Sequence, residues 1–410
     1  MKESAGVSIT DMGVKLGQNG VDNATIAFDN VRVPRINMMN RHTDVDENGN
    51  FSSKIKGISQ RFFKVTERLL SGRLCIASMA VGASRACLYI AITYAMQRLA
   101  VSADGNSTTP IFEYQLQQNT LIPLLARSIA LGLLHVKCKN IFQNPAGYED
   151  TLLALCCVDK TLNGWNLERV ASICRERCGG QGYLSVNKFG DYMSIAHAAV
   201  TAEGDNRVLM VKVCKDMLTN VNKKGHKLPM PSRSNKELAA LNDISELSTL
   251  CDLLRFREVS LFKELVNTTK RLLKEGKSPY EVLMRETSDV MQDLATTYGE
   301  RQTLEYGAEC VNGLKSSENK RVMTDVLRLY AIDILERDLK HYILAGVLSP
   351  KAAKGVTKTK HALVKELAKS TSDLLDCLNV PKHALYAPIA ADYIKYNAEP
   401  NYGEVIGAKM

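Results

Sequence analysis

The sequence lacks the short motifs that identify several common classes of enzyme and metal protein. It has no Cys-x-x-Cys pair, no P-loop, no Gly-x-Gly-x-x-Gly and no nucleophile elbow. Its 11 cysteines are odd in number and scattered, which indicates reduced thiols rather than a disulfide framework. Cys174 and Cys178 have no second pair at metal-ligand spacing, so no metal site is predicted. Serine, histidine and aspartate are interpreted as structural, including His197 as a packed helix residue.

Signals for secretion, membranes and nucleic acid are also weak or missing. The opening MKESAGVSITDMG has no apolar stretch, and the apolar run from Leu74 ends at Arg85, so neither a secretory signal nor a membrane span is expected. The net charge of +9 suits anionic ligands such as nucleotides. The basic runs Lys223–Lys227 and Lys351–Lys365 contain no aromatic residues to stack on bases. We therefore interpret them as solvated surface and expect no nucleic-acid partner.

The chain has the length and composition of a globular protein with more than one domain. Its 410 residues are 45% hydrophobic and 24% charged, with only 11 prolines. Alternation of apolar and polar residues from Ala24 to Pro34 predicts strands near the start. The predicted fold is mainly α: residues 1–55 end a middle β domain, 56–221 form a first helical bundle, 222–236 a linker, and 237–410 a second helical domain.

Helical periodicity dominates after the first strands. Three segments and a fourth that begins after Gly204 predict a bundle; the three are residues 59–96, 110–144 and 148–177. The first of them is apolar nearly all round, so we expect it to be buried on most faces. Further on, the predicted helices stop at three places rich in proline and small polar residues: 276–279, 349–350 and 379–381.

Four segments resemble the acyl-coenzyme A oxidase family. They are GVKLGQNGVDNATIAFDNVRVPR (13–35), RERCGGQGY (175–183), TAEGDNRVLM (201–210) and DCLNVPKHALYAPIAADYIKYN (376–397). The last resembles the terminal segment of oxidases and favours them over the smaller dehydrogenases. The resemblance covers nearly the whole chain. Complete members carry an additional amino-terminal helical domain and most of a β domain, so we expect Met1 to lie in mid-domain.

The resemblance implies that Glu203 is the catalytic base. Desaturation of an acyl thioester requires removal of a weakly acidic α proton, so the base needs a dry pocket and the carbonyl needs hydrogen bonds. Gly204 leaves room for the thioester, and the resemblance implies that it contacts substrate and that Asn206 contacts the cofactor. From the residues alone, Asp205 is a helix cap and Glu203 lies near the positive end of a helix dipole. The two readings are compatible.

The resemblance also implies that the chain binds FAD through residues far from Glu203 in the sequence. Gly179, Gly180 and Gln181 match the segment that contacts the flavin of a neighbouring subunit, with Gln181 where histidine is frequent. Arg98 and Gln115 match the pair that reaches the same flavin, and a guanidinium suits a pyrophosphate. Without the resemblance, the two glycines are a helix stop and Arg98 is a surface residue near a helix end.

The reaction implied by the resemblance converts fatty acyl-CoA and O2 to trans-2-enoyl-CoA and hydrogen peroxide in peroxisomal β-oxidation. The final Ala408-Lys409-Met410 resembles a Ser-Lys-Leu peroxisomal address. A cofactor shared between subunits predicts at least a homodimer. Two alternatives stay open: a truncated, non-catalytic helical interaction protein, and a dehydrogenase that delivers electrons to another protein.

Overall fold

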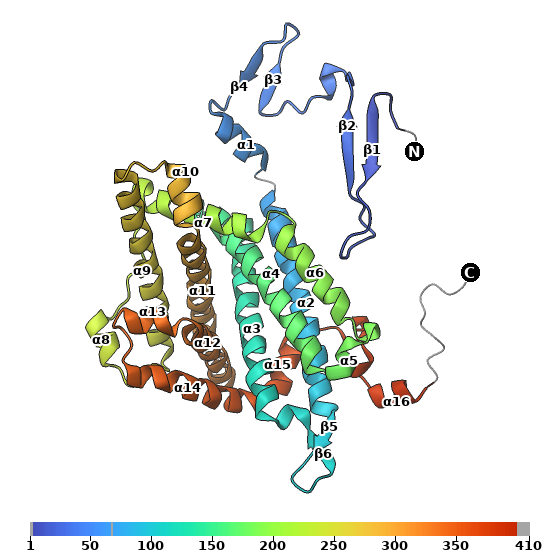
Figure 1. The fold of residues 1–410 in the computed structure, drawn as a ribbon, viewed down its shortest axis with the longest axis vertical. Coiled ribbons are helices and arrows are strands. Elements are labelled where there is room, and N and C mark those ends of the chain that lie inside the picture. The colour runs from blue at the N-terminus through green and yellow to red at the C-terminus, as the bar shows by residue number, and fades with distance from the viewer. Residues whose placement is uncertain (1–2, 67–68, 400–410) are drawn as a thin grey trace. The chain divides into compact units, whose positions relative to one another are not determined.

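The computed structural model describes residues 3–66 and 69–399 and is built mainly from helices (Figure 1). This confirms the prediction of a mainly α fold. The chain divides into two compact units, Met1–Arg73 and Leu74–Met410, and each is described by itself. The tripeptide Ala408-Lys409-Met410 lies outside the described residues.

The described residues of the first unit include two short antiparallel strand pairs and the helix α1. Their bounds are β1 Val7–Asp11, β2 Ala24–Phe28, β3 Thr43–Val45, β4 Phe51–Ser53 and α1 Ile58–Thr66. In the first pair Val7 lies opposite Phe28 and Asp11 opposite Ala24. Apolar side chains of this pair are exposed; Ile26 and Phe28 retain 54% and 69% of their accessible surface. The alternation that predicted a strand to Pro34 overestimates its length, because β2 ends at Phe28 and Asn30 has a positive φ of 48°.

The first half of the second unit consists of long helices joined by short ones and a hairpin. The bounds are α2 Leu69–Gln97, β5 Leu99–Val101, β6 Ser107–Pro110, α3 Gln115–Gln143, α4 Leu152–Arg177, α5 Gly179–Tyr183, α6 Phe189–Thr201 and α7 Asn206–Lys224. The described residues of the predicted helix over 59–96 are helical, in α1 and α2, and residues 67 and 68 lie outside the described residues. The sequence analysis identified neither α5 nor the full extent of α6. His197 lies on α6 but is exposed, so its reading as a packed residue is wrong.

The second half is also mainly helical over its described residues, which end at 399. The bounds are α8 Asn235–Ala240, α9 Leu247–Lys274, α10 Pro279–Glu281, α11 Ser288–Asn312, α12 Ser317–Arg337, α13 Leu339–Leu344, α14 Pro350–Ala368, α15 Thr371–Cys377 and α16 Tyr393–Ala398. The stops predicted from proline are confirmed. Ser278 and Ser349 each cap a helix whose first residue is proline, because proline needs no partner for a missing amide hydrogen.

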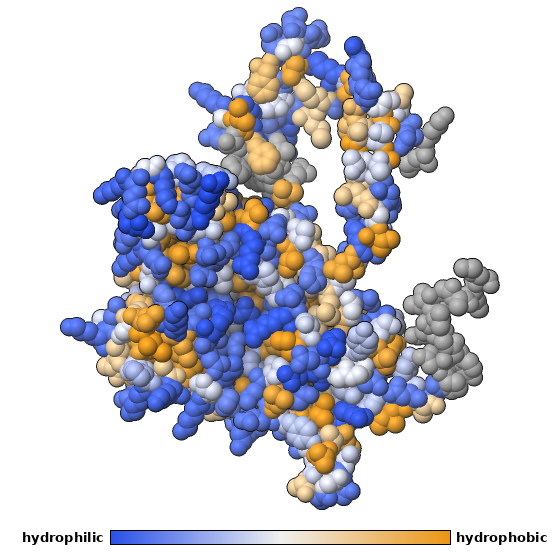
Figure 2. Space-filling model, in the orientation of Figure 1, coloured by the Kyte–Doolittle hydropathy of each residue, from blue (hydrophilic) through white to orange (hydrophobic). Residues whose placement is uncertain are grey.

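The core of the helical unit is continuous. The buried cluster includes Leu88 and Ile92 on α2, Leu125 on α3, and Leu327 and Tyr330 on α12. Figure 2 shows hydrophilic residues over most of the visible face of the helical unit, with apolar residues scattered among them. The division of this unit into a bundle, a linker and a second domain remains a prediction.

Two helices, α2 and α3, are long and apolar enough to pass a length and composition test for membrane spans. Within the most apolar windows, 61% of the α2 residues and 78% of the α3 residues are buried inside the protein. Core helices of a bundle have this property, because their apolar faces pack against other helices. The expectation for α2 needs one correction, since Cys75, Ser78 and Gly82 form an exposed face on its first half.

Candidate active site

Glu203 lies on a turn between α6 and α7 whose backbone is in an unusual conformation. Glu203 has φ +57° and Gly204 has φ +105°, so two successive residues lie in the left-handed region. For a residue with a side chain this conformation costs about 1–2 kcal/mol, so surrounding contacts must hold it. The Glu203 side chain is half-buried. Strained residues of this kind are concentrated at functional sites.

Lys160 on α4 binds the turn through two hydrogen bonds. Its ammonium donates to the carbonyl oxygen of Gly204 at 2.7 Å and to Oδ1 of Asn206 at 2.8 Å. The side chain is among the largest that are fully buried. A buried ammonium is costly unless oxygen atoms satisfy it, so these bonds fix where the turn lies relative to α4. Lys160 was not predicted as a site residue from the sequence. A charged residue inside the apolar stretch of α4 could have indicated a buried side chain with polar partners.

The remaining residues of the turn anchor it to the start of α7. Asp205 caps this helix by accepting hydrogen bonds from the amides of Arg207 at 2.9 Å and Val208 at 3.2 Å. The predicted capping role of Asp205 is therefore confirmed. Asn206 is buried, and its amide donates to the carbonyl oxygen of Thr161 at 3.4 Å. Asn206 thus ties the turn to α4, which leaves its expected role in cofactor binding as a prediction.

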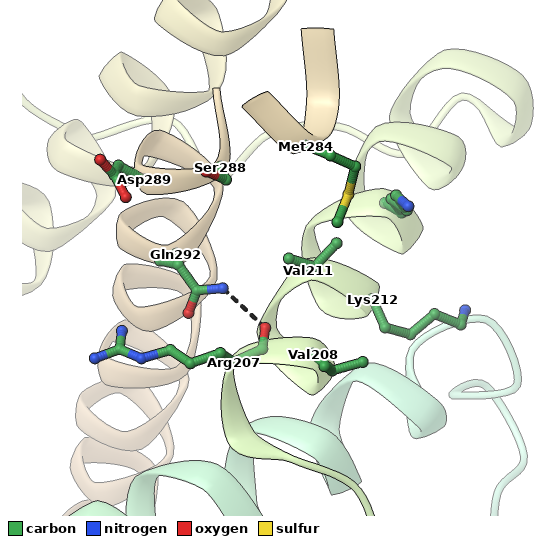
Figure 3. Close-up of a pocket in the computed structure, with 9 residues that line it drawn as sticks. Arg207, Val208, Val211, Lys212, Met284, Ser288, Asp289 and Gln292 are labelled. Carbon is green, nitrogen blue, oxygen red and sulfur yellow. Dashed lines mark hydrogen bonds between the residues drawn. The ribbon is translucent and has the colours of Figure 1, made fainter. Parts of the chain in front are cut away.

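A hollow of about 710 Å³ lies beside the first turns of α7 (Figure 3). It is lined by α7, by α11 and by a π-helical turn at Val282–Glu286. Gln292 of α11 donates to the carbonyl oxygen of Arg207 at 2.8 Å, the dashed line in Figure 3. On another side of the same residue, the Arg207 guanidinium lies 4.7 Å from the ring centre of Trp165. The residue after the turn is therefore held by both α4 and α11.

Replacement of Gly204 by alanine tests this geometry. A Cβ atom there would lie 3.0 Å from Leu209, and alanine disfavours the positive φ of this position. We therefore expect a loss of about 1–2 kcal/mol in the free energy of unfolding. Trp165 is the only tryptophan, and its fluorescence should change as Arg207 shifts. Gly225 at the other end of α7 is the matched control: it also has positive φ, but its Cβ would have no atom within 4 Å. Unchanged Trp165 emission in Gly204→Ala would contradict the prediction.

Arg98 and Gln115 are brought to one end of the bundle by a hairpin. Arg98 directly follows α2, Gln115 begins α3, and β5 pairs with β6 between them. Both side chains are exposed. A hydrogen bond with Tyr393 of α16 raises the pKa of Arg98 above its ordinary value. The residues between Arg98 and Gln115 thus form a hairpin, and Tyr393 of α16 contacts the arginine.

Gly179, Gly180 and Gln181 lie in α5 rather than in a loop that simply ends α4. Gly179 has φ +57°, which lets the chain reverse and start a new helix immediately. At Gly182 a Cβ would lie 2.1 Å from the carbonyl oxygen of Arg175, so only glycine allows α5 to fold back on α4. Close by, Gln117 donates to the carbonyl oxygen of Arg177 at 3.1 Å. This contact places α5 at the same end of the bundle as Gln115.

The predicted site residues therefore form two groups within one chain. The first group lies near Lys160 of α4 and consists of Glu203, Gly204 and Asn206. The second group lies near Arg177 and consists of Arg98, Gln115 and the α5 residues. From residue 160 to residue 177 of α4 is roughly 25 Å at the helical rise. One copy of the chain does not bring the groups together. Over residues 3–66 and 69–399 no cluster of metal-ligating side chains is present, and none of the 11 cysteines forms a disulfide.

Two family models match the chain. "Acyl-CoA oxidase, C-alpha1 domain" covers residues 67–218, and "Acyl-CoA oxidase" covers residues 246–392. The sequence is 28% identical to peroxisomal acyl-coenzyme A oxidase 2 of Arabidopsis thaliana over 98% of this chain and 60% of the relative. It is 28% identical to human peroxisomal acyl-coenzyme A oxidase 3 over 94% of this chain and 59% of the relative. The chain thus spans about three fifths of these relatives.

The solved structures confirm the fold. Acyl-CoA oxidase-1 of Caenorhabditis elegans, complexed with FAD and ATP, superposes with a TM-score of 0.84 at 20% identity. The superposition covers 97% of this chain and 62% of that structure. At this identity the similarity establishes the arrangement of helices.

Proposed function

Because the chain belongs to the acyl-CoA oxidase family, we propose that it desaturates fatty acyl-CoA to trans-2-enoyl-CoA, with O2 reduced to hydrogen peroxide. The observation that carries this proposal is the Glu203–Gly204 turn. Its two left-handed residues are held in place by the buried ammonium of Lys160. The surroundings thus hold the backbone that carries the carboxylate before substrate arrives, and a proton-abstracting base requires such a fixed support.

In the proposed reaction, one oxygen of Glu203 takes the α proton of the acyl thioester. The electrons of the broken C–H bond become part of the new double bond, while the β carbon loses a hydride. Gly204 keeps the backbone beside the base free of a side chain. Lys160 acts through the backbone, because its bond to the Gly204 carbonyl holds the turn from which the base projects. FAD, when bound, supplies the acceptor for the hydride and the route of its electrons to O2.

The end of the bundle near Arg177 fits the polar part of FAD. Arg98 and Gln115 offer exposed donors, and a guanidinium matches a pyrophosphate. Two buried polar atoms there, Oε1 of Gln117 and Nε of Arg177, have no hydrogen-bond partner among the described residues. Buried polar atoms rarely remain unpaired, so a polar ligand at this end would satisfy them. We propose Arg98, Gln115, Gly179, Gly180 and Gln181 as the residues that hold FAD.

A homodimer is part of the proposal. The FAD-binding group and the Glu203 group are roughly 25 Å apart along α4. One flavin ring therefore cannot contact both groups of the same chain. Two copies that each lend one group to the other's site would resolve the separation. The peroxisome is the proposed location, because two of the relatives described above are named peroxisomal.

Electron acceptor choice distinguishes an oxidase from a dehydrogenase. We expect purified protein with fatty acyl-CoA and air to form hydrogen peroxide and enoyl-CoA in equal amounts. Peroxide is followed by a coupled peroxidase and enoyl-CoA by its ultraviolet absorbance. Enoyl-CoA formation that appears only after an artificial electron acceptor is added would instead identify a dehydrogenase.

A non-catalytic interaction role is the second candidate, and the exposed apolar side chains of β1 and β2 favour it. Ile9, Ile26 and Phe28 each retain half or more of their accessible surface, and exposed strand pairs readily recruit a protein partner. The colour of the purified protein separates the candidates. A yellow protein that releases flavin on denaturation supports catalysis, whereas a colourless one that co-purifies with a full-length oxidase subunit supports the interaction role.

A further inference from the structure

Three helices of the bundle bring together a serine, a histidine and an aspartate. Oγ of Ser78 on α2 lies 2.7 Å from Nε2 of His135 on α3. Nδ1 of His135 lies 2.8 Å from Oδ2 of Asp159 on α4. These are the contacts and ring positions of a catalytic triad, in which serine meets one imidazole nitrogen and aspartate the other. Triads are recognised by this geometry and not by their order in the sequence.

Burial divides the three residues in the way that nucleophilic catalysis requires. Asp159 is fully buried and His135 is 4% exposed, whereas Ser78 lies on the exposed face of α2 with Cys75 and Gly82. One helical turn beyond Ser78, a Cβ on Gly82 would meet no atom of residues 3–66 or 69–399 within 4 Å. Ser78 is therefore an accessible residue whose base is shielded from water.

The hydrogen bonds around Asp159 assign the tautomer of His135. The side-chain amide of Asn163 donates to Oδ1 of Asp159 at 2.8 Å, and in the ionised carboxylate Oδ2 can only accept from His135. Nδ1 of His135 then carries the proton, and Nε2 presents its lone pair to the Ser78 hydroxyl. Burial raises the pKa of Asp159, while the hydrogen bonds from His135 and Asn163 oppose that shift.

We propose that Ser78 is an activated nucleophile that accepts acyl groups from activated esters or thioesters, with His135 as its base and Asp159 as a positioning residue. The site is separate from the Glu203 turn and uses none of its residues. Its ligand class is a small acyl carbonyl with a good leaving group. An ester and a thioester share this chemistry, and the experiment below distinguishes them.

The step conserves atoms and electrons. Oγ of Ser78 bonds to the carbonyl carbon as its proton passes to Nε2 of His135. The bond from that carbon to the leaving oxygen or sulfur then breaks, and the leaving group takes the proton from His135. An acyl ester on Ser78 remains. Water restores the serine by the same route and releases a carboxylic acid.

Acylation should be easier to observe than turnover. The amides around Ser78 belong to the interior of α2, where helical hydrogen bonds already use them. They do not supply the oxyanion donors that accelerate a dedicated hydrolase by about 10²–10³-fold. We therefore expect the acyl-serine to accumulate as a burst of product followed by slow turnover.

The test is site-specific labelling of the whole chain. Diisopropyl fluorophosphate should modify one residue, and peptide mass spectrometry should place it on Ser78. p-Nitrophenyl acetate and acetyl-CoA, used separately, should acetylate the same residue. Labelling by p-nitrophenyl acetate alone assigns esters as donors, and labelling by acetyl-CoA alone assigns thioesters.

Variants with matched controls decide the outcome. Ser78→Ala should abolish the label, and His135→Gln should slow labelling about 10²-fold. Asp159→Asn should also slow the labelling of Ser78. If Asp159 had a purely structural role, the labelling rate and the melting temperature would fall together, whereas we expect the rate to fall much more than the melting temperature. Ser172→Ala, at an exposed serine of α4, is the control and should label as the unaltered chain does. The proposal is overturned if Ser78 carries no label or if Ser172 is labelled equally. Both outcomes are measured on the unaltered chain, so they do not depend on whether any variant folds.

Discussion

Replacement of Glu203 by glutamine is expected to abolish enoyl-CoA formation while the protein keeps its flavin. Glutamine has nearly the same size, and the two bonds that Lys160 donates to the turn end on the Gly204 carbonyl oxygen and on Oδ1 of Asn206. The substitution replaces the basic carboxylate by a neutral amide. Loss of a general base costs about 10²–10⁴-fold in rate, and more where no water can replace it. Stopped-flow reduction of the flavin by acyl-CoA under anaerobic conditions measures the affected step directly.

The control for this variant is Glu149→Gln, an exposed glutamate before α4, which should leave flavin reduction unchanged. Flavin content and melting temperature are measured for both variants. If Glu203→Gln lost its flavin together with its activity, Glu203 would be a structural residue and the proposed base would lie elsewhere. If it retained the unaltered rate, the assignment of the base would be wrong.

Much of the fold was accessible from the sequence because its signals are local. The prolines at 279 and 350 mark helix starts, since a proline at the first helical position follows a capping serine. The cap at Asp205 is equally local. The short helix α5 was missed because its two glycines usually stop a helix, and only the contact of Gly182 with the Arg175 carbonyl shows why a second helix starts there.

The parts of the site that could not be predicted depend on contacts between helices. Lys160 is 44 residues from Gly204 in the sequence. The helical periodicity of α4 does not indicate that the Lys160 ammonium binds the Gly204 carbonyl oxygen. Ser78 and His135 are 57 residues apart. Without a nucleophile elbow, nothing in the sequence separates this serine from the others. Packing of α2, α3 and α4 creates these arrangements, so they become visible only in three dimensions.

A buried charge network joins the helices of the two halves of the helical unit. Glu300 on α11 is fully buried and accepts two hydrogen bonds from Arg337 on α12, each of 2.9 Å. Arg127 on α3 and Arg257 on α9 approach the same carboxylate at 3.7 Å and 3.5 Å. Four helices thus meet at one negative charge. Removal of that charge leaves several guanidinium groups close together in a poorly solvated place.

Glu300→Gln is therefore expected to lower the free energy of unfolding by about 3–5 kcal/mol, the usual cost of breaking a buried ion pair on one side. Chemical denaturation at neutral pH, followed by circular dichroism, measures the loss. Glu309→Gln, an exposed position on the same helix, is the control and should change stability by less than about 0.5 kcal/mol. A similar loss in both variants would mean that the network adds no stability of its own.

The same carboxylate predicts a dependence of stability on pH. Burial alone would raise the pKa of Glu300, but Arg337, Arg127 and Arg257 outweigh it and hold the pKa below the ordinary 4.5. A carboxyl group whose pKa is lower in the folded state stabilises the protein above the unfolded value and loses that contribution as the pH falls through the folded value. The unaltered chain should therefore lose stability progressively below about pH 4.5. Glu300→Gln should show a shallower slope over that range, because residue 300 no longer binds a proton on unfolding; parallel curves for the two proteins would show that Glu300 does not titrate as described.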